Sequence, residues 1–264
     1  MYWELNLAKI RPITLLEIPR KILMKVLTNR LSTKLSVNSN ILKDHNYAGL
    51  SGKSTHEPIH ILNAIMEDAR ESKKELWILM QDMSKAYDLV NRNNLLKALN
   101  RIRLPKKFIE FISNSLKYRT NQIITDFGFT ESYKVGNGID QGEIMSPLLW
   151  VIYYDPLFSK IEKIKNDKCL GYEINPNNQM LSVTDLAYMD DSTWIGKKKK
   201  ELETILKVAD SFNEYNGIKV NKEKSKLIVI NSRTPEYRDI TLIEPHCTDW
   251  IFSTIDHKCN LVRI

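Results

Sequence analysis

The stretch SVTDLAYMDDSTWIG, residues 182–196, sets two adjacent aspartates inside an otherwise apolar run. The segments 182–189 and 192–196 have the composition of short β-strands. Successive side chains of a straight strand point to opposite faces, so Asp190 and Asp191 could not serve one site from within a strand. If the two segments pair, Asp190 and Asp191 form the tip of a tight hairpin, where aspartate is tolerated and both carboxylates can face one way.

Apolar periodicity predicts the elements around this hairpin. We expect helices at 17–35, 57–73, 93–103, 105–118, 146–161 and 200–217, strands at 76–80 and 226–230, and a hairpin at 121–138. In the first helix, Ile22, Val26, Leu27 and Leu31 fall on one face. From residue 76 to 230 the order is strand, helices, strand, strand, helix, strand. This order predicts an α/β (α+β) fold, with a split β-α-β-β-α-β antiparallel sheet and helices on one side.

The composition is that of an ordinary globular protein. Of the 264 residues, 42% are hydrophobic and 27% are charged. The net charge of +7 favours a polyanionic partner such as nucleic acid. Three cysteines make no disulfide framework, so we expect an intracellular setting. The N-terminus does not have the pattern of a signal peptide, and no apolar run reaches the roughly 18 residues of a membrane span, so we expect no membrane partner.

A third carboxylate is expected beside the hairpin. The apolar strand that begins at Leu76 ends at Gln81 and Asp82, and in the expected sheet it can lie next to the hairpin. Three aspartates at one point repel one another unless cations are present. Ligands that are all oxygen suit Mg²⁺, which also accepts phosphate oxygens. Two such ions can activate an attacking oxygen and stabilise a leaving one in phosphoryl transfer.

Four segments in order resemble the A, B, C and D motifs of reverse transcriptases. They are LMQDMSKAYDLVN (79–91), GIDQGEIMSPLLW (138–150), AYMDD (187–191) and GIKVNKEKSKLIV (217–229). The upstream segment 11–31 resembles the fingers of the non-LTR (LINE-type) retrotransposon branch. The resemblance covers about residues 11–230 and implies the fingers and palm of a right-hand polymerase, with the thumb absent or truncated.

The resemblance also implies a domain division. Residues 1–75 would be a fingers-like segment, and residues 76–230 would be the palm with motifs A to D. Part of the fingers would be inserted around 105–137. Residues 231–264 would be a truncated C-terminal tail and a possible thumb remnant. No primer-grip turn is found in it.

Catalytic and metal-binding roles follow from the same resemblance. Asp82, Asp190 and Asp191 match the metal-binding carboxylates, and the backbone carbonyl of Met83 would be a further ligand. Lys224 matches the motif D lysine thought to protonate the leaving pyrophosphate, although a lysine at such a position is more often only a solvated side chain. Two Mg²⁺ ions are implied, with Mn²⁺ as a substitute.

Five positions match residues around the incoming nucleotide. Tyr87 matches the aromatic residue that excludes a ribose 2′-hydroxyl, although it could also be a core aromatic. Gln141 and Gly142 match the loop beside the nucleotide, where a glycine lets the backbone approach the substrate. Met189 would touch the primer end. Lys53 is the nearest cation for the triphosphate, because the usual arginine of the fingers loop is missing.

The implied activity is that of an RNA-directed DNA polymerase of a retrotransposon. It would extend a DNA primer on an RNA template with dNTPs. Two alternatives stay open: an inactive remnant that only binds nucleic acid, and an RNA-directed RNA polymerase. Asp140 and Glu143 depart from the family pattern, and two extra carboxylates near a triphosphate pocket should hinder anion binding unless they point away.

Two other patterns suggest different chemistry and are weaker. GLSGKST (49–55) resembles a P-loop, but the glycine required five positions before Gly52 is Tyr47. The tail cluster of His246, Cys247, His257 and Cys259 could bind zinc, although its spacing fits no closed structural site well.

Overall fold

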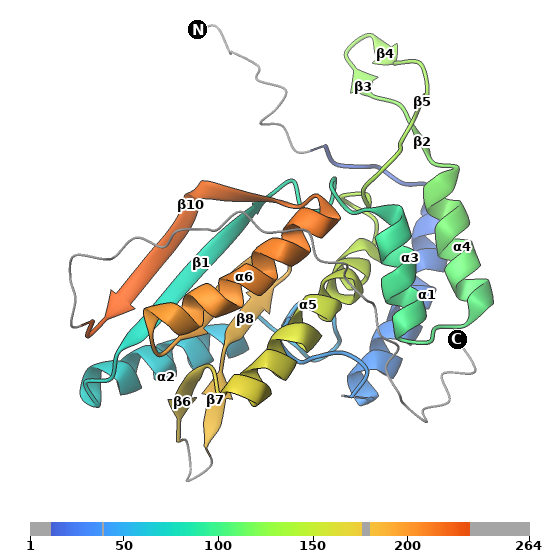
Figure 1. The fold of residues 1–264 in the computed structure, drawn as a ribbon. Coiled ribbons are helices and arrows are strands. Elements are labelled where there is room, and N and C mark those ends of the chain that lie inside the picture. Colours follow the sequence, from blue (N-terminus) through green and yellow to red (C-terminus); the bar gives the residue numbers. More distant parts are fainter. Residues whose placement is uncertain (1–11, 39, 176–179, 233–264) are drawn as a thin grey trace, which may run out of the picture.

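A four-stranded antiparallel sheet lies at the centre of the molecule (Figure 1). The computed structural model describes residues 12–38, 40–175 and 180–232. In spatial order the strands are β10 (Lys219–Ile230), β1 (Leu76–Ser84), β9 (Asp191–Gly196) and β8 (Asp185–Tyr188). Each strand runs antiparallel to its neighbour.

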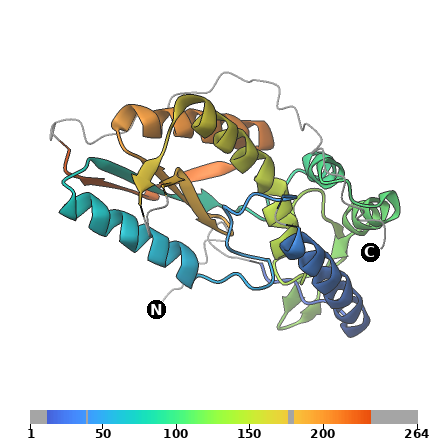
Figure 2. The same ribbon diagram turned by 90° about the horizontal axis from the view of Figure 1, so that it is seen from below.

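The chain order confirms the split β-α-β-β-α-β plan. After β1 come three helices, then the β8–β9 hairpin, one helix and β10; the helices are α3 (Arg92–Arg101), α4 (Lys106–Lys117), α5 (Ser146–Lys168) and α6 (Lys199–Asn216). Helices α5 and α6 cover one face of the sheet (Figure 2). Helix α2 (His56–Glu71), which precedes β1, packs on the opposite face. The palm helices are therefore on one side, as expected, while an element from residues 1–75 covers part of the other.

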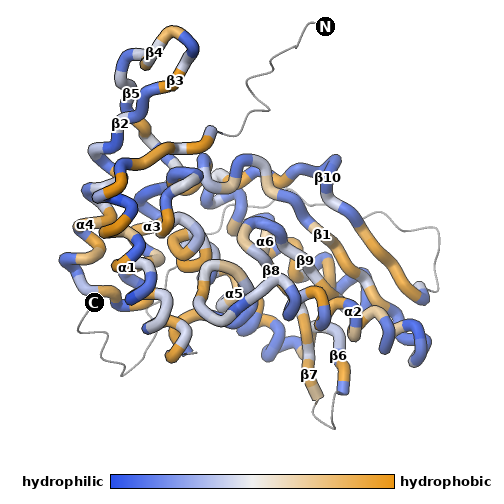
Figure 3. Tube along the Cα trace, turned by 180° about the vertical axis from the view of Figure 1, so that it is seen from behind, coloured by the Kyte–Doolittle hydropathy of each residue, from blue (hydrophilic) through white to orange (hydrophobic). Residues whose placement is uncertain are grey.

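Strand β1 is buried on both faces because its consecutive apolar side chains point alternately to the two sides of the sheet. Trp77 and Leu79 pack in the cluster with α5 and α6, whereas Leu76 and Ile78 pack in the cluster with α2. Strands β1 and β10 carry long hydrophobic stretches where they lie side by side (Figure 3). The strand continues past the predicted end to Ser84, which carries Asp82 to the end of the sheet.

Helix α6 follows the predicted pattern. Gly217 ends it in the left-handed conformation with φ +68°, and its buried apolar side chains are Leu202, Ile205, Leu206, Ala209 and Phe212. The amide of the following residue, Ile218, donates to the carbonyl of Asn213 at 2.8 Å. A glycine has no Cβ to oppose this turn, so the helix stops there and β10 can begin.

Helix α1 (Ile18–Val37) forms where a helix is expected, but its predicted apolar face is wrong in part. Leu31 is buried, and Leu27 packs against the core. Ile22 and Val26 are 61% and 49% exposed. The buried face of the helix contains Met24 and Leu35 beside Leu31.

Small strands complete the fold. The predicted hairpin at 121–138 is confirmed and projects from the end of α4 (Figure 1). It pairs β2 (Thr120–Asn121) with β5 (Tyr133–Lys134), and β3 (Ile124–Thr125) with β4 (Gly128–Phe129). The predicted strand at 182–189 divides into β7 (Leu181–Val183), which pairs with β6 (Tyr172–Ile174), and β8. The predicted tail cluster at 246–259 lies outside the described residues.

Candidate active site

The turn between β8 and β9 differs by one residue from the prediction. Tyr188 pairs with Asp191, so the two-residue loop consists of Met189 and Asp190, and Asp191 is the first residue of β9. Met189 adopts the left-handed conformation with φ +57°. Two-residue hairpin loops favour a positive φ because it matches the twist of the strands, and Met189 supplies it at the first loop position.

Strand pairing brings Asp82 to the hairpin. In the antiparallel register of β1 and β9, Met80 pairs with Thr193 and Gln81 with Ser192. The pairing ends there, and Asp82 and Asp191 are the next residues of the two strands. Asp82 therefore lies at the end of the sheet where the β8–β9 turn begins.

The three carboxylates are not gathered around a single point. Asp82 and Asp190 are half-buried, and Asp191 is exposed. In the part of the chain that the structure describes, no three His, Cys, Asp or Glu side chains are gathered closely enough to share one metal ion, so these aspartates would have to turn toward one another to bind one.

A cavity of about 150 Å³ lies beside the turn and joins several predicted residues. Met83, Tyr87, Gln141 and Asp190 line it together with Lys85, Ala86 and Asp88. The Tyr87 hydroxyl donates to the sulfur of Met189 at 3.5 Å, and its ring lies 5.9 Å from that of Trp150. Burial, and then the charge of Asp190, raise the pKa of Tyr87 to about 12. The phenol at this cavity is therefore neutral at physiological pH.

The loop that carries Gln141 packs against the segment before α1. The amide of Thr14 donates to the carbonyl of Gln141 at 2.7 Å. Gly142 has φ +113°, and a Cβ built on it would lie 2.6 Å from the carbonyl oxygen of Thr14. In this structure the backbone that approaches Gly142 is that of Thr14. The glycine is thus required by the packing of the loop, a reason that the sequence did not reveal.

Asp140 and Glu143 are both neutralised by arginines. Asp140 lies 3.0 Å from Nη1 of Arg119, and Glu143 lies 2.9 Å from Nη2 of Arg20. Both carboxylates are buried. Their charges are therefore compensated within the protein, and the expected obstacle to anion binding is removed.

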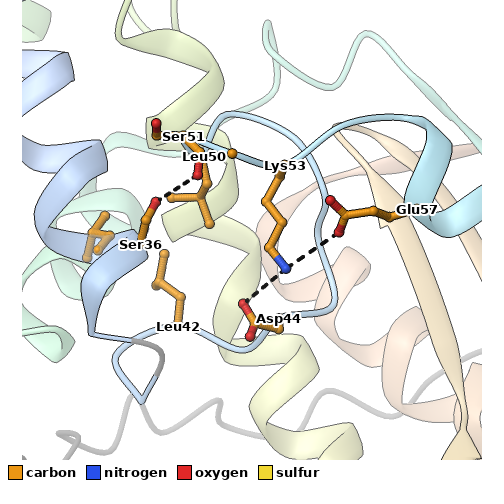
Figure 4. Close-up of a pocket in the computed structure, with 9 residues that line it drawn as sticks. Ser36, Leu42, Asp44, Leu50, Ser51, Lys53 and Glu57 are labelled. Carbon is orange, nitrogen blue, oxygen red and sulfur yellow. Dashed lines mark hydrogen bonds and ion pairs between the residues drawn. The ribbon is translucent and has the colours of Figure 1, made fainter.

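Lys53 lies apart from the aspartates. Its ammonium group lies 3.7 Å from Asp44 and 3.8 Å from Glu57, as Figure 4 shows. It also lies 5.1 Å from the centre of the Tyr47 ring. Lys53, Asp44 and Glu57 line a different cavity, of about 240 Å³, between the end of α1 and the start of α2. The structure does not bring Lys53 to the cavity beside Asp190.

Lys224 lies in a bulge of β10 next to Asp82. Met80 pairs with Lys226 and Asp82 pairs with Asn221, so residues 222–225 of β10 lie opposite Gln81 alone. The Ser225 hydroxyl anchors the bulge by accepting from the amide of Asp82 at 3.3 Å. The side chain of Lys224 is exposed. This bulge holds the lysine at the same end of the sheet as the aspartates.

Four functional positions were missed by sequence reasoning. Arg20 and Arg119 neutralise the loop carboxylates, and Asn46 and Trp150 hydrogen-bond the backbone of Met189. Each of these contacts joins segments far apart in the chain. No local pattern could have indicated them, although Trp150 lies inside the stretch that resembles motif B.

A family model agrees with this geometry. The model described as reverse transcriptase (RNA-dependent DNA polymerase) matches residues 6–257. The chain belongs to the reverse transcriptase family.

Curated relatives of this reverse transcriptase chain include retrotransposon proteins. It is 24% identical to a Pol polyprotein of the R2 element of Popillia japonica, over 85% of this chain and 30% of the relative. It is 23% identical to the R2DM Pol polyprotein of Drosophila melanogaster, over 77% of this chain and 18% of the relative. The family model confirms the reverse transcriptase membership predicted from the motifs, and these retrotransposon proteins are what the chain is similar to. The chain spans less than a third of either relative.

Solved structures share the fold of this reverse transcriptase chain. Telomerase from Candida albicans, solved with a fragment of telomeric RNA, matches with a TM-score of 0.58 at 14% identity, over 84% of this chain and 37% of that one. Apo telomerase from Candida tropicalis, truncated from its C-terminal domain, matches with a TM-score of 0.53 at 21% identity, over 84% and 42%. These matches support the fingers and palm assignment. Among the described residues, no helix is both long and apolar enough to cross a membrane.

Proposed function

We propose that this chain is the polymerase core of a non-LTR retrotransposon reverse transcriptase. It would transfer nucleotides from dNTPs to the 3′-hydroxyl of a DNA primer on an RNA template. The observation that supports this most is the register of β1 and β9, which brings Asp82 to the end of the sheet that carries Asp191, while Asp190 lines the cavity with Tyr87. The R2 relatives support a retrotransposon origin.

The residues at this end of the sheet fit divalent metal ions. The donor set consists of carboxylate oxygens, which Mg²⁺ and Mn²⁺ prefer. Within the described ranges, neither Asp82 nor Asp190 has a lysine or arginine ion-pair partner. Asp82, Asp190 and Asp191 would hold two Mg²⁺ ions, with the Met83 carbonyl as a further ligand. When bound, such ions activate the attacking hydroxyl and stabilise the charge of the leaving phosphate.

The protein's own residues would position the substrates. Tyr87 would exclude a ribose 2′-hydroxyl and so select deoxynucleotides, and its neutral phenol adds no repulsion to the triphosphate. Gln141 would present its loop to the nucleotide, Met189 would contact the primer end, and Lys224 would donate a proton to pyrophosphate. Catalysis would consist of positioning and charge stabilisation, without a covalent enzyme intermediate.

The role proposed for Lys53 needs a rearrangement. Lys53 would reach the triphosphate only by leaving Asp44 and Glu57. The domain division follows the proposal: fingers in 1–75 and around 105–137, palm in 76–230, and a tail from 231. Because the relatives are much longer, the activity of the full protein and its target site belong to the proposal as well.

A primer-extension assay tests the function. Purified protein, a DNA primer annealed to an RNA template, dNTPs and Mg²⁺ should give extended primer. Asp190→Asn should reduce the rate by at least about 10³-fold, because it removes a charge that would stabilise the transition state. Asp126→Asn is the matched control, since Asp126 is an exposed carboxylate of the β3–β4 hairpin. Equal background with wild type and Asp190→Asn would reject catalysis.

The remaining alternatives predict different outcomes. RNA binding that weakens with salt and ignores Mg²⁺, together with no incorporation, would identify an inactive nucleic-acid-binding remnant. Incorporation of ribonucleotides by the wild type would identify an RNA-directed RNA polymerase. Asp140 and Glu143, where this chain departs from the family pattern, are paired with arginines. They leave no uncompensated charge at the site, which favours an active enzyme over the inactive remnant.

A further inference from the structure

The backbone of Met189 is held entirely by side chains. Its amide donates to Oδ1 of Asn46 at 3.2 Å. Its carbonyl accepts from Nδ2 of Asn46 at 3.1 Å and from the Trp150 indole nitrogen at 2.8 Å. A carbonyl oxygen has two lone pairs, so the hydrogen-bonding capacity of this turn residue is fully used.

Asn46 is buried beside the Met189–Asp190 turn and is held by further hydrogen bonds. It is 1% exposed, and its Oδ1 also accepts from the amide of Ala48 at 3.1 Å. Residues 45–47 lie parallel to β8: the amide of Ala187 donates to the carbonyl of His45, and the amide of Tyr47 donates to the carbonyl of Ala187. This short addition to the sheet edge aims the Asn46 side chain at the turn.

The segment before Asn46 is anchored as well. The amide of Lys43 donates to the buried carboxylate of Asp155 at 2.6 Å, and Arg101 donates to the other oxygen of that carboxylate. The His45 ring contacts the buried Asp185 carboxylate at the start of β8. Asn46 is therefore fixed from the helices and from the sheet.

We propose that Asn46, acting with Trp150, is a positioning residue that locks the Met189–Asp190 turn and thereby sets the place of the Asp190 carboxylate relative to Asp82. This inference rests on the proposed polymerase function for its catalytic consequence.

The need for such a lock follows from the conformation of Met189. A non-glycine residue at φ +57° is uncommon, and the surrounding contacts must compensate for its cost. The neighbouring Asp190 moves with the turn. Displacing a reacting group by about 1 Å can reduce a rate by about 10²-fold, so a loosened turn should slow the chemical step more than nucleotide binding.

Three variants test the proposal. Asn46→Ala removes both bonds to Met189, and Trp150→Phe removes one donor while keeping an aromatic ring. Asn94→Ala is the control, because Asn94 is also buried and donates to Asn216, away from the turn. Amide hydrogen exchange of residues 186–193, the kcat and KM for dNTPs, and the melting temperature are measured for each.

We expect Asn46→Ala to speed exchange of the Met189 amide by about 10-fold or more and to lower kcat by about 10- to 100-fold with little change in KM. Trp150→Phe should lower kcat less, since one donor to the Met189 carbonyl remains. Asn94→Ala should lower the melting temperature without either effect. Unchanged Met189 exchange in Asn46→Ala overturns the proposal, and so does unchanged kcat. If the wild type extends no primer, the polymerase function fails, while the exchange data still decide whether Asn46 holds the turn.

Discussion

Arg20 of α1 contacts a single carboxylate oxygen of Glu143 through both Nε and Nη2, each at 2.9 Å. The second oxygen of Glu143 accepts from the amide of Ile144 at 3.0 Å. This pair ties the first helix to the loop that carries Gln141. It also makes a loop carboxylate compatible with a site for an anionic substrate.

Breaking this pair should affect both stability and substrate binding. Arg20→Gln leaves the buried Glu143 carboxylate without its partner, and we expect a loss of about 1–3 kcal/mol in the free energy of unfolding, because Arg20 is partly exposed. The uncompensated charge should also raise the KM for dNTPs. Denaturant unfolding and steady-state kinetics measure the two effects.

The double variant Arg20→Gln/Glu143→Gln is the control for charge. It should restore the KM, since no unpaired carboxylate remains. A KM that stays raised in the double variant would show that Arg20 acts on the nucleotide by another route.

Gly142→Ala should destabilise the protein by about 2 kcal/mol or more. The new methyl group would lie 2.6 Å from the Thr14 carbonyl oxygen, and the φ of +113° is strained for any residue with a Cβ. Gly136→Ala is the matched control, because a Cβ there meets no atom within 4 Å. Thermal unfolding of both variants makes the comparison, and equal melting temperatures would contradict the packing role of Gly142.

Tyr87→Ala should relax the selection against ribonucleotides by about 10- to 100-fold in the ratio of kcat/KM values, because the cavity loses the ring that limits its size. Tyr87→Phe keeps the ring and should keep the selection. Because the pKa of Tyr87 is raised to about 12, the wild-type selection should not change between pH 7 and 9. Incorporation assays with dNTP and rNTP pairs give these ratios, and a relaxed Tyr87→Phe would assign the selection to the hydroxyl.

Asp210 on α6 should make stability depend on pH. Burial raises the pKa of its carboxyl to about 6, with Lys222 opposing the shift. The folded state therefore binds the proton more tightly than the unfolded state, and stability falls as pH rises from about 4 to about 6. Asp210→Asn should remove this slope and stabilise the protein at pH 8 by about 1 kcal/mol, a figure reduced for partial exposure. Unfolding curves at pH 4 and pH 8 test it; a slope retained in the variant would place its origin in another group.

Local sequence was sufficient wherever a pattern decides a structure through nearby residues. The apolar run from Leu76 forms a strand that is buried on both faces. In α6 the spacing of the apolar residues determines the buried side, and Gly217 determines where the helix ends. The order of elements predicts the split β-α-β-β-α-β sheet. With the motif resemblance, these patterns also selected the three aspartates and the family.

Tertiary structure decided what depends on pairing between distant segments. The two-residue turn consists of Met189 and Asp190. Lys53 forms ion pairs with Asp44 and Glu57. The backbone of Thr14 packs against Gly142. Tertiary structure also supplied Asn46 as the partner of the turn. A sequence pattern reports periodicity and turn preference over a few residues. Strand register, burial of charge and hydrogen bonds across more than a hundred residues arise only when the whole chain packs, because each partner is chosen by geometry and not by its neighbours in sequence.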